Sequence, residues 1–144
     1  MLYMLDTDTC SYVIRKRPEE VLSAMQVRAQ KGDALCVSVI TYAELRLGAE
    51  RSTNSRKYNR AIELFCERLY SISAWDKSAA DRFAVVQSRL IRAGTPIGYN
   101  DAMIAAHALD KNAVLVTNNH KRFSKVVRLK LDNWVPKKSS RQQN

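Results

Sequence analysis

Three short apolar runs, far apart in the chain, constrain the fold more than any other feature. They occupy residues 2–5, 34–40 and 113–116, and polar residues follow each of them. None alternates regularly between polar and apolar residues, which is typical of strands buried on both faces of a parallel sheet. Helical patterns fill the intervals between the runs. We therefore predict an α/β domain with a mostly parallel central sheet and helices on both faces.

Apolar residues at helical spacing, together with capping and turn residues, predict the helices. Their expected caps or first residues are Thr9 or Ser11, Pro18, Thr41, Asn54, Asp76, Asn100 and Lys121. Gly94 is expected to end the helix that starts near Asp76. A last strand is expected near residues 127–131.

The length of 144 residues suits one hydrophobic core and is too short for two. We expect one domain over residues 1–135, followed by a disordered basic tail over residues 136–144. No stretch approaches the roughly 18 consecutive apolar residues of a membrane span. The residues before Asp6 contain no basic segment of the secretory type. These features predict a cytoplasmic protein that does not enter a membrane.

The three cysteines, Cys10, Cys36 and Cys66, are widely spaced and form no CxxC pair. We expect them to be free and mostly buried thiols. The chain has only two histidines, His107 and His120, and neither lies close in sequence to a cysteine. This spacing argues against a zinc site.

The formal net charge of +10 and the isoelectric point near 9.8 favour an anionic partner. A basic domain of this size attracts polyanions over a long range and raises their local concentration. The alternative is a protein that is simply basic and binds nothing through this charge. We favour contact with a nucleic acid.

Acidic and amide side chains recur just after the expected strands. Asp6 follows the first run, Glu44 lies about one helical turn beyond the second, and Asn118 and Asn119 follow the third. Asp101 opens a helix rich in small residues. In an open parallel sheet, ligands bind in the crevice at the carboxyl ends of the strands. These side chains are therefore expected to converge at one edge of the sheet.

Each acid also has a purely structural explanation. Asp6 could close an Asx-turn or cap a helix, and Asp101 could be favoured by the dipole of its helix. The segment from Thr41 to Glu44 fits a capping box, in which the Glu44 side chain bonds back to the Thr41 amide. Together, however, three acids at one edge of a basic protein favour a bound cation. Oxygen ligands indicate Mg²⁺ or Mn²⁺, and a metal ion that meets phosphate is typical of a nuclease.

Four segments of the chain resemble the PIN-domain VapC toxins. They cover residues 4–9, 38–45, 97–109 and 115–119. They occur in the family's order, and the resemblance extends over nearly the whole chain up to Trp134. It implies a PIN-like fold and a Mg²⁺-dependent endoribonuclease that is the toxin of a type II toxin–antitoxin pair. It also implies a homodimer and a VapB-type antitoxin whose C-terminal segment covers the active site.

The same resemblance implies roles for individual residues. Asp6, Glu44 and Asp101 match the family's acidic positions, with Asp6 and Asp101 as direct metal ligands. Residues 100–107 are similar to those of enteric VapC toxins that cut initiator tRNA in the anticodon stem-loop. The chain departs from the family at Asn119, where an acid is usual, and at Arg122, where related toxins often carry Glu. Asn119 is expected to complete the site without adding charge, which suits one metal ion better than two.

Two other functions compete with this interpretation. A phospho-receiver signalling domain also gathers acids and Mg²⁺ at the edge of a parallel sheet, but it needs a phosphate-accepting Asp at the end of a central strand, where this chain has Thr41. A non-catalytic nucleic-acid-binding module would need only the basic charge. His107 lies nearly two helical turns from Asp101 in an apolar segment, so we expect a buried, hydrogen-bonded histidine rather than a general base.

Overall fold

The structure is a computed structural model that describes residues 1–137. Most of the basic tail expected at residues 136–144 therefore lies outside the described residues. Within the described part of the chain, none of the helices is both long and apolar enough to cross a membrane.

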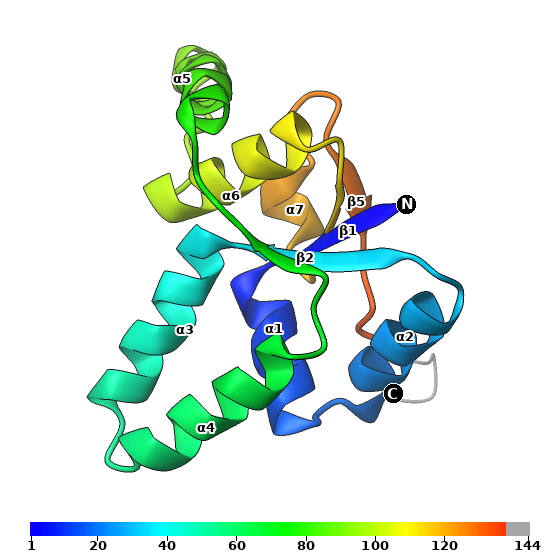
Figure 1. Ribbon diagram of the computed structural model, residues 1–144. Coiled ribbons are helices and arrows are strands. Elements are labelled where there is room, and N and C mark those ends of the chain that lie inside the picture. The colour runs from blue at the N-terminus through cyan, green and yellow to red at the C-terminus, as the bar shows by residue number, and fades with distance from the viewer. Residues whose placement is uncertain (138–144) are drawn as a thin grey trace, which may run out of the picture.

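Five parallel strands form the sheet, in the order β3-β2-β1-β4-β5 (Figure 1). The strands are β1 (Leu2–Leu5), β2 (Ala34–Ser38), β3 (Ser71–Ser73), β4 (Val114–Val116) and β5 (Lys130–Asp132). In the register of the sheet, Met4 of β1 lies opposite Cys36 on one side and Leu115 on the other. The first run of the sequence is thus the central strand, and the other two apolar runs flank it.

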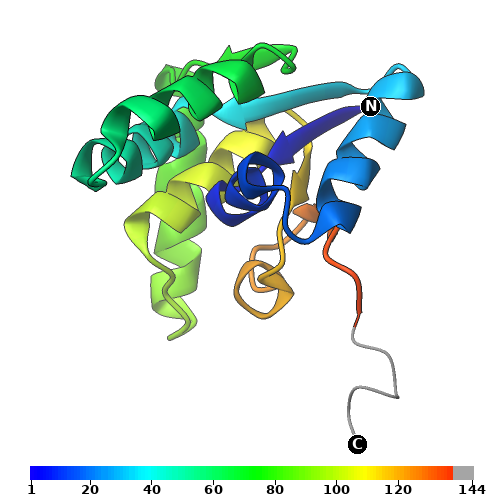
Figure 2. The same cartoon turned by 90° about the horizontal axis from the view of Figure 1, so that it is seen from below.

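Helices cover both faces of this sheet (Figures 1 and 2). They are α1 (Thr7–Arg15), α2 (Glu19–Gln30), α3 (Val39–Arg51), α4 (Ser55–Cys66), α5 (Lys77–Arg92), α6 (Tyr99–Asp110) and α7 (His120–Phe123). Buried residues of α1 to α4 pack against one face, and those of α5 to α7 pack against the other. The predicted α/β class with a mostly parallel sheet is confirmed.

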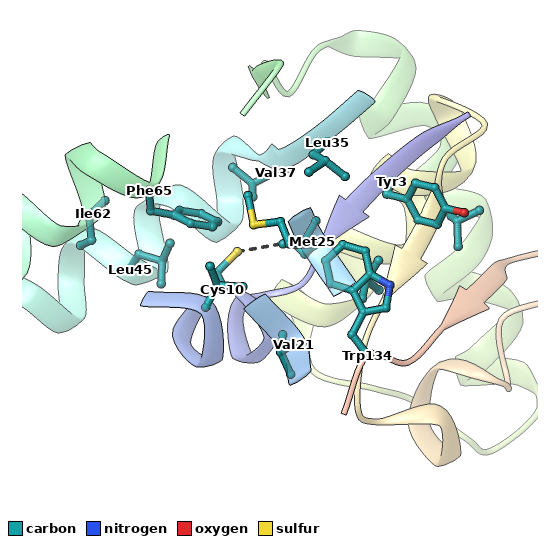
Figure 3. Close-up of a cluster of buried hydrophobic side chains, with 14 of the residues drawn as sticks. Tyr3, Cys10, Val21, Met25, Leu35, Val37, Leu45, Ile62, Phe65 and Trp134 are labelled. Atoms are coloured by element: carbon teal, nitrogen blue, oxygen red, sulfur yellow. Dashed lines mark hydrogen bonds between the residues drawn. The ribbon is translucent and has the colours of Figure 1, made fainter. Parts of the chain in front are cut away.

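Alternate residues of β1 supply the two cores. Tyr3 and Leu5 belong to the cluster under α1 to α4, and Met4 belongs to the cluster under α5 and α6. Figure 3 shows the first cluster, in which the Trp134 ring lies near Tyr3, with ring centroids 6.1 Å apart. Because both faces are covered, every position of the strand is apolar, as the unbroken run in the sequence indicated.

Two helix starts differ from the prediction by two residues or more, and both bear on the site; α6 and α7 each begin one residue earlier than predicted, at Tyr99 and His120. Helix α1 begins at Thr7, with Asp6 rather than Thr9 or Ser11 as its N-cap. Helix α3 begins at Val39, with Ser38 as its N-cap, so the predicted strand over residues 34–40 ends two residues early. The Ser38 side chain accepts a hydrogen bond from a backbone N–H group in the first turn of α3. This cap starts the helix, and so ends the strand, despite the β-branched residues that follow.

Other differences concern the edges of the sheet. Strand β3 was not expected, because its three residues are partly exposed and its sequence, Ser71-Ile72-Ser73, gives no apolar run. The last strand lies at Lys130–Asp132 rather than near residues 127–131, since Arg128 adopts a left-handed conformation with φ of 69°. Edge strands are short and poorly marked in the sequence, and neither difference alters the central strands.

Candidate active site

The carboxyl ends of β1, β2 and β4 meet at one edge of the sheet and position the candidate site. The amide of Asp6, directly after β1, donates to the carbonyl oxygen of Val116 in β4 at 3.0 Å. The Thr9 hydroxyl donates to the same oxygen at 3.1 Å. Thr117 follows β4 and is fully buried. The backbone therefore fixes the first acid of the site at the junction of two strands.

Asp6 is a buried carboxylate, with 6% of its surface exposed. One of its oxygens, Oδ1, accepts the Thr9 amide at 2.8 Å and caps α1. Burial raises the pKa of Asp6 above its usual range, although hydrogen bonds from Thr117 and Thr9 partly oppose that shift. The cap explains why the chain tolerates an acid here, but the burial leaves its charge incompletely compensated.

Glu44 lies one turn and a half into α3, on the side that faces α1. Its Oε1 accepts the Thr7 hydroxyl at 2.7 Å. The predicted bond from Glu44 back to the Thr41 amide is absent, because α3 starts before Thr41 and Thr41 is buried inside the helix. The capping-box explanation of Glu44 is therefore wrong. Thr7 was not singled out in the sequence, although it directly follows Asp6 in the motif of residues 4–9.

Asp101 lies in the first turn of α6 and is about one-third exposed. Its Oδ2 is paired with the Arg122 guanidinium of α7, whose side chain is about half exposed. Arg122 attracted notice in the sequence only as a departure from the family's usual residue. The structure places it directly on one of the two predicted metal ligands.

Asn119 is the N-cap of α7. Its side-chain oxygen Oδ1 accepts a hydrogen bond from the backbone N–H of Arg122 at 3.2 Å, and its own backbone N–H donates to the Thr117 hydroxyl at 2.9 Å. The side chain next to it, Asn118, accepts from Asn133 at 3.1 Å. Asn119 thus fixes the short helix that carries Arg122, and its amide side chain is already used as a cap.

One network of contacts joins the four predicted site residues. Asp6 is linked to Glu44 through Thr7, which follows it in the chain, and to Asn119 through the Thr117 hydroxyl. Asn119 is linked in turn to Asp101 through Arg122. Within residues 1–137, however, no three acidic, cysteine or histidine side chains form a ready-made cage for a metal ion.

This donor set nevertheless suits magnesium. Mg²⁺ keeps several waters and needs only one or two carboxylates from the protein, with phosphate oxygens supplying further ligands. Asp6 supplies a buried carboxylate whose charge lacks a full partner, and Asp101 supplies a second, more exposed one. Their role as ligands stays a prediction.

His107 is buried, as the sequence predicted, and takes no part in this network. Its Nδ1 lies 2.8 Å from the hydroxyl oxygen of Ser38, the cap of α3, and its ring packs edge-on against Trp75. Burial lowers the pKa of His107, and the charge of Lys111 adds to the effect. The three cysteines are free, and Cys10 and Cys36 are buried, as expected.

Two surface grooves bear on the site: the first includes Glu44 in its lining, and the described lining of the second shares no residue with the acidic cluster. An apolar groove of about 390 Å³ is bounded by α1, α3 and α4, and Thr7 and Glu44 are among its lining residues. A second groove runs along α5 and carries four basic side chains: Arg82, Arg89, Lys125 and Arg128. None of its described lining residues is acidic.

The model of the PIN domain family matches residues 3–129 of the chain. Ribonuclease VapC2 of Haemophilus influenzae is 43% identical over 133 residues, which cover 92% of this chain and 98% of that protein. The protein of Salmonella typhimurium named tRNA(fMet)-specific endonuclease VapC is 34% identical, over 92% of this chain and 97% of its own length.

A solved structure gives the same result in three dimensions. The chain is similar, with a TM-score of 0.88 and 34% identity, to one in the crystal structure of VapBC2 from Rickettsia felis bound to a DNA fragment from their promoter. The match covers 94% of this chain and 100% of that one.

Proposed function

Since this chain belongs to the PIN domain family, we propose that it is an endoribonuclease and the toxin of a VapBC-type toxin–antitoxin pair. The observation that carries the proposal is the network at the carboxyl ends of β1, β2 and β4, which joins Asp6, Glu44 and Asp101 in a chain whose net charge is +10. The full-length match to proteins named ribonuclease VapC supports it.

Asp6 and Asp101 would hold one Mg²⁺ or Mn²⁺ ion. Such an ion, when bound, supplies positive charge that polarises the phosphodiester and favours the loss of a proton from water. Asn119 adds no charge and its Oδ1 already accepts the Arg122 amide, which supports one ion rather than two.

Glu44 orients the attacking water in this proposal. The Thr7 hydroxyl binds one of its oxygens, Oε1, and restricts the carboxylate to one orientation. In-line attack of this water on phosphorus, with the P–O3′ bond broken and the 3′-oxygen leaving as a hydroxyl, would give a 5′-phosphate and a 3′-hydroxyl. A 2′,3′-cyclic product would instead require a basic group beside the 2′-hydroxyl, and the buried His107 is directed at Ser38.

For the substrate we propose the initiator tRNA, cut in the anticodon stem-loop. The support is the similarity to the Salmonella protein, whose name specifies tRNA(fMet), and the likeness of residues 100–107 to that group. The basic groove beside α5 offers a surface for the RNA backbone.

For the partner we propose a VapB-type antitoxin whose C-terminal segment lies in the apolar groove bounded by α1, α3 and α4. Glu44 and Thr7 line this groove, so a segment bound there would cover one side of the acidic cluster. The Rickettsia structure, a VapBC complex, supports an assembly of this kind. The homodimer stays a prediction.

The test of the activity is a comparison of Asp6→Asn and Asp101→Asn with the wild type. We expect both variants to lose growth inhibition on induction and to lose cleavage of purified tRNA by at least about a hundredfold, the scale of removing one preorganised electrostatic contact from an active site. Asp81→Asn is the matched control, because Asp81 is an exposed acid paired with Lys77 on α5.

Sequencing of RNA ends after brief induction identifies the target and the product chemistry. Full cleavage in EDTA, or a cyclic phosphate at the cut, would overturn the metal-dependent mechanism. Unchanged toxicity of Asp6→Asn would instead favour a non-catalytic nucleic-acid-binding module.

A further inference from the structure

The guanidinium of Arg122 forms an ion pair with the carboxylate of Asp101, and this pair bears on how the site would bind a metal ion. Two of the site's acids accept bonds from neutral donors: Asp6 from the Thr9 amide and Glu44 from the Thr7 hydroxyl. Asp101 alone among them is paired with a cation, the guanidinium of Arg122. The partner of Asp101 thus already supplies the kind of charge that a metal ion would bring.

The position of Arg122 is built into the local fold. The Asn119 side chain caps α7 by accepting a hydrogen bond from the Arg122 backbone N–H. The backbone N–H of Asn119 in turn donates to the hydroxyl of the buried Thr117. The guanidinium therefore projects from a helix that is anchored to the site. The contact also joins α6 to α7, two elements that are separated in sequence by β4.

We propose that Arg122 is an internal competitor for the metal ion, a tethered cation that a divalent ion must displace from Asp101. This inference rests on the proposed metal-dependent activity. The guanidinium already offsets part of the negative charge of Asp101 that would attract a metal ion, and two cations beside one carboxylate repel each other. Arg122 therefore raises the concentration of metal ion at which the site fills.

The consequence for function is a threshold concentration of metal ion, below which the site stays empty. In the metal-free protein, the guanidinium of Arg122 offsets the charge of the Asp101 carboxylate. Asp101 becomes a metal ligand only when the metal ion is concentrated enough to replace Arg122 there. Arg122 acts here as a positioning residue, because its effect passes through Asp101 rather than through the reacting atoms.

The test is a titration of the full chain with Mn²⁺, with the free ion followed by its electron paramagnetic resonance. Arg122→Ala is expected to bind Mn²⁺ about three- to tenfold more tightly than the wild type, on the scale of one partly exposed ion pair and one like-charge repulsion. The Mn²⁺ concentration that gives half-maximal cleavage should fall by the same factor. Unchanged Mn²⁺ affinity would overturn the proposal.

Two further variants make the result specific. Arg60→Ala removes a guanidinium from an exposed pair with Glu63 on α4 and should leave Mn²⁺ affinity unchanged. Arg122→Lys keeps the charge and should stay close to the wild type. A lysine variant that binds Mn²⁺ as tightly as Arg122→Ala would contradict a competition between charges.

A double-mutant cycle with Asp101→Asn separates direct competition from long-range charge. The gain in affinity on removing Arg122 should shrink once Asp101 is an amide, and equal gains in both backgrounds would overturn the proposal. Thermal unfolding in EDTA checks that each variant is folded. Because Mn²⁺ binding is measured without RNA, failure of this inference is distinct from failure of the proposed activity, which Asp6→Asn tests through cleavage.

Discussion

Asp6 caps a helix and, in the proposed active site, would also bind a metal ion, and these two roles differ in the charge they need. As the N-cap of α1 it needs only an oxygen acceptor for the Thr9 amide, which an asparagine also supplies. As a metal ligand it needs a negative charge in a buried place, where burial raises its pKa. The fold therefore stabilises the charged form of Asp6 only in part.

We expect Asp6→Asn to raise the melting temperature of the metal-free protein while it abolishes cleavage. The raised pKa means that the folded state holds the Asp6 proton more tightly than the unfolded state. Folding stability is therefore lost as the pH rises from 3.8 through the pKa of the folded state, and the loss persists at neutral pH.

Asp6→Ala is the control, because it removes the cap as well as the charge and should lose about 1 kcal/mol of capping energy relative to Asp6→Asn. Thermal unfolding in EDTA measures all three proteins. An asparagine variant that melts below the wild type would contradict an uncompensated charge at Asp6.

His107 also makes folding stability depend on pH, but its contribution is lost as the pH falls, whereas that of Asp6 is lost as the pH rises. Burial lowers its pKa, so the unfolded chain takes up a proton first as the pH falls below 6.5. Stability should decline as the pH falls through 6.5 toward the lower pKa of the folded state, with a slope of at most about 1.4 kcal/mol per pH unit for the one proton. Urea unfolding at several pH values measures the slope. His107→Gln should flatten it, and an equal slope in that variant would assign the effect to other groups.

At the scale of elements, Ser38 joins the two helices that carry acids of the site. It caps α3, which bears Glu44, by accepting the Ile40 amide at 3.1 Å, and it contacts His107 of α6, which bears Asp101. The Ser38 hydroxyl is fully buried, so its loss leaves unpaired polar groups in the core beneath the site.

Ser38→Ala should destabilise the protein by about 2–3 kcal/mol, from a lost cap and a buried imidazole nitrogen left without its partner. We also expect slower cleavage, because α3 and α6 lose a shared contact. Asp76→Ala provides the comparison, since Asp76 caps α5 at an exposed position through the Ala79 amide. That variant should cost about 1 kcal/mol and cleave normally. Equal effects on cleavage would show that the Ser38 contact does not support the site.

The elements that could be predicted from the sequence are those with a strong local signal. The three apolar runs gave the central strands, and Gly94, with φ of 71°, ended α5 as expected. The start of α3 was missed because the β-branched residues Val39 and Ile40 favour a strand, whereas the buried Ser38 caps a helix. Strand β3 was missed because its pairing with β2, and not its own sequence, makes it a strand.

The candidate site was predictable only in part. Asp6, Glu44 and Asp101 could be grouped because parallel strands bring their carboxyl ends to one edge. The contacts of Thr7 with Glu44 and of Arg122 with Asp101 could not be foreseen, since each depends on how a side chain of one helix meets another helix. Sequence patterns specify faces and ends of elements but not these side-chain pairings.

At the scale of the whole molecule, the net charge of +10 should govern RNA affinity. Binding to a polyanion releases counterions, and each contact with a single-stranded phosphate contributes about −0.7 to the slope of log affinity against log salt. Arg89→Ala combined with Arg128→Ala removes two basic side chains from the groove along α5. The slope should become shallower by about 1.4.

Fluorescence anisotropy of a labelled tRNA in EDTA, at several salt concentrations, measures this slope. The matched control combines Lys57→Ala with Arg60→Ala on α4, which removes the same charge from another surface. If the control changes the slope as much as the groove variant, net charge alone governs the affinity and the groove is not a specific RNA-binding surface.

The sheet order has a consequence for the timing of synthesis. Strand β1 lies between β2, which follows it closely in the chain, and β4, which begins at Val114. A ribosome adding about 5–20 residues per second therefore needs several seconds or more between Asp6 and Asn119. During that interval the nascent chain contains Asp6 and Glu44 but lacks the strand and the short helix that complete their surroundings. A site arranged in this way is completed only late in translation, after most of the domain has been synthesised.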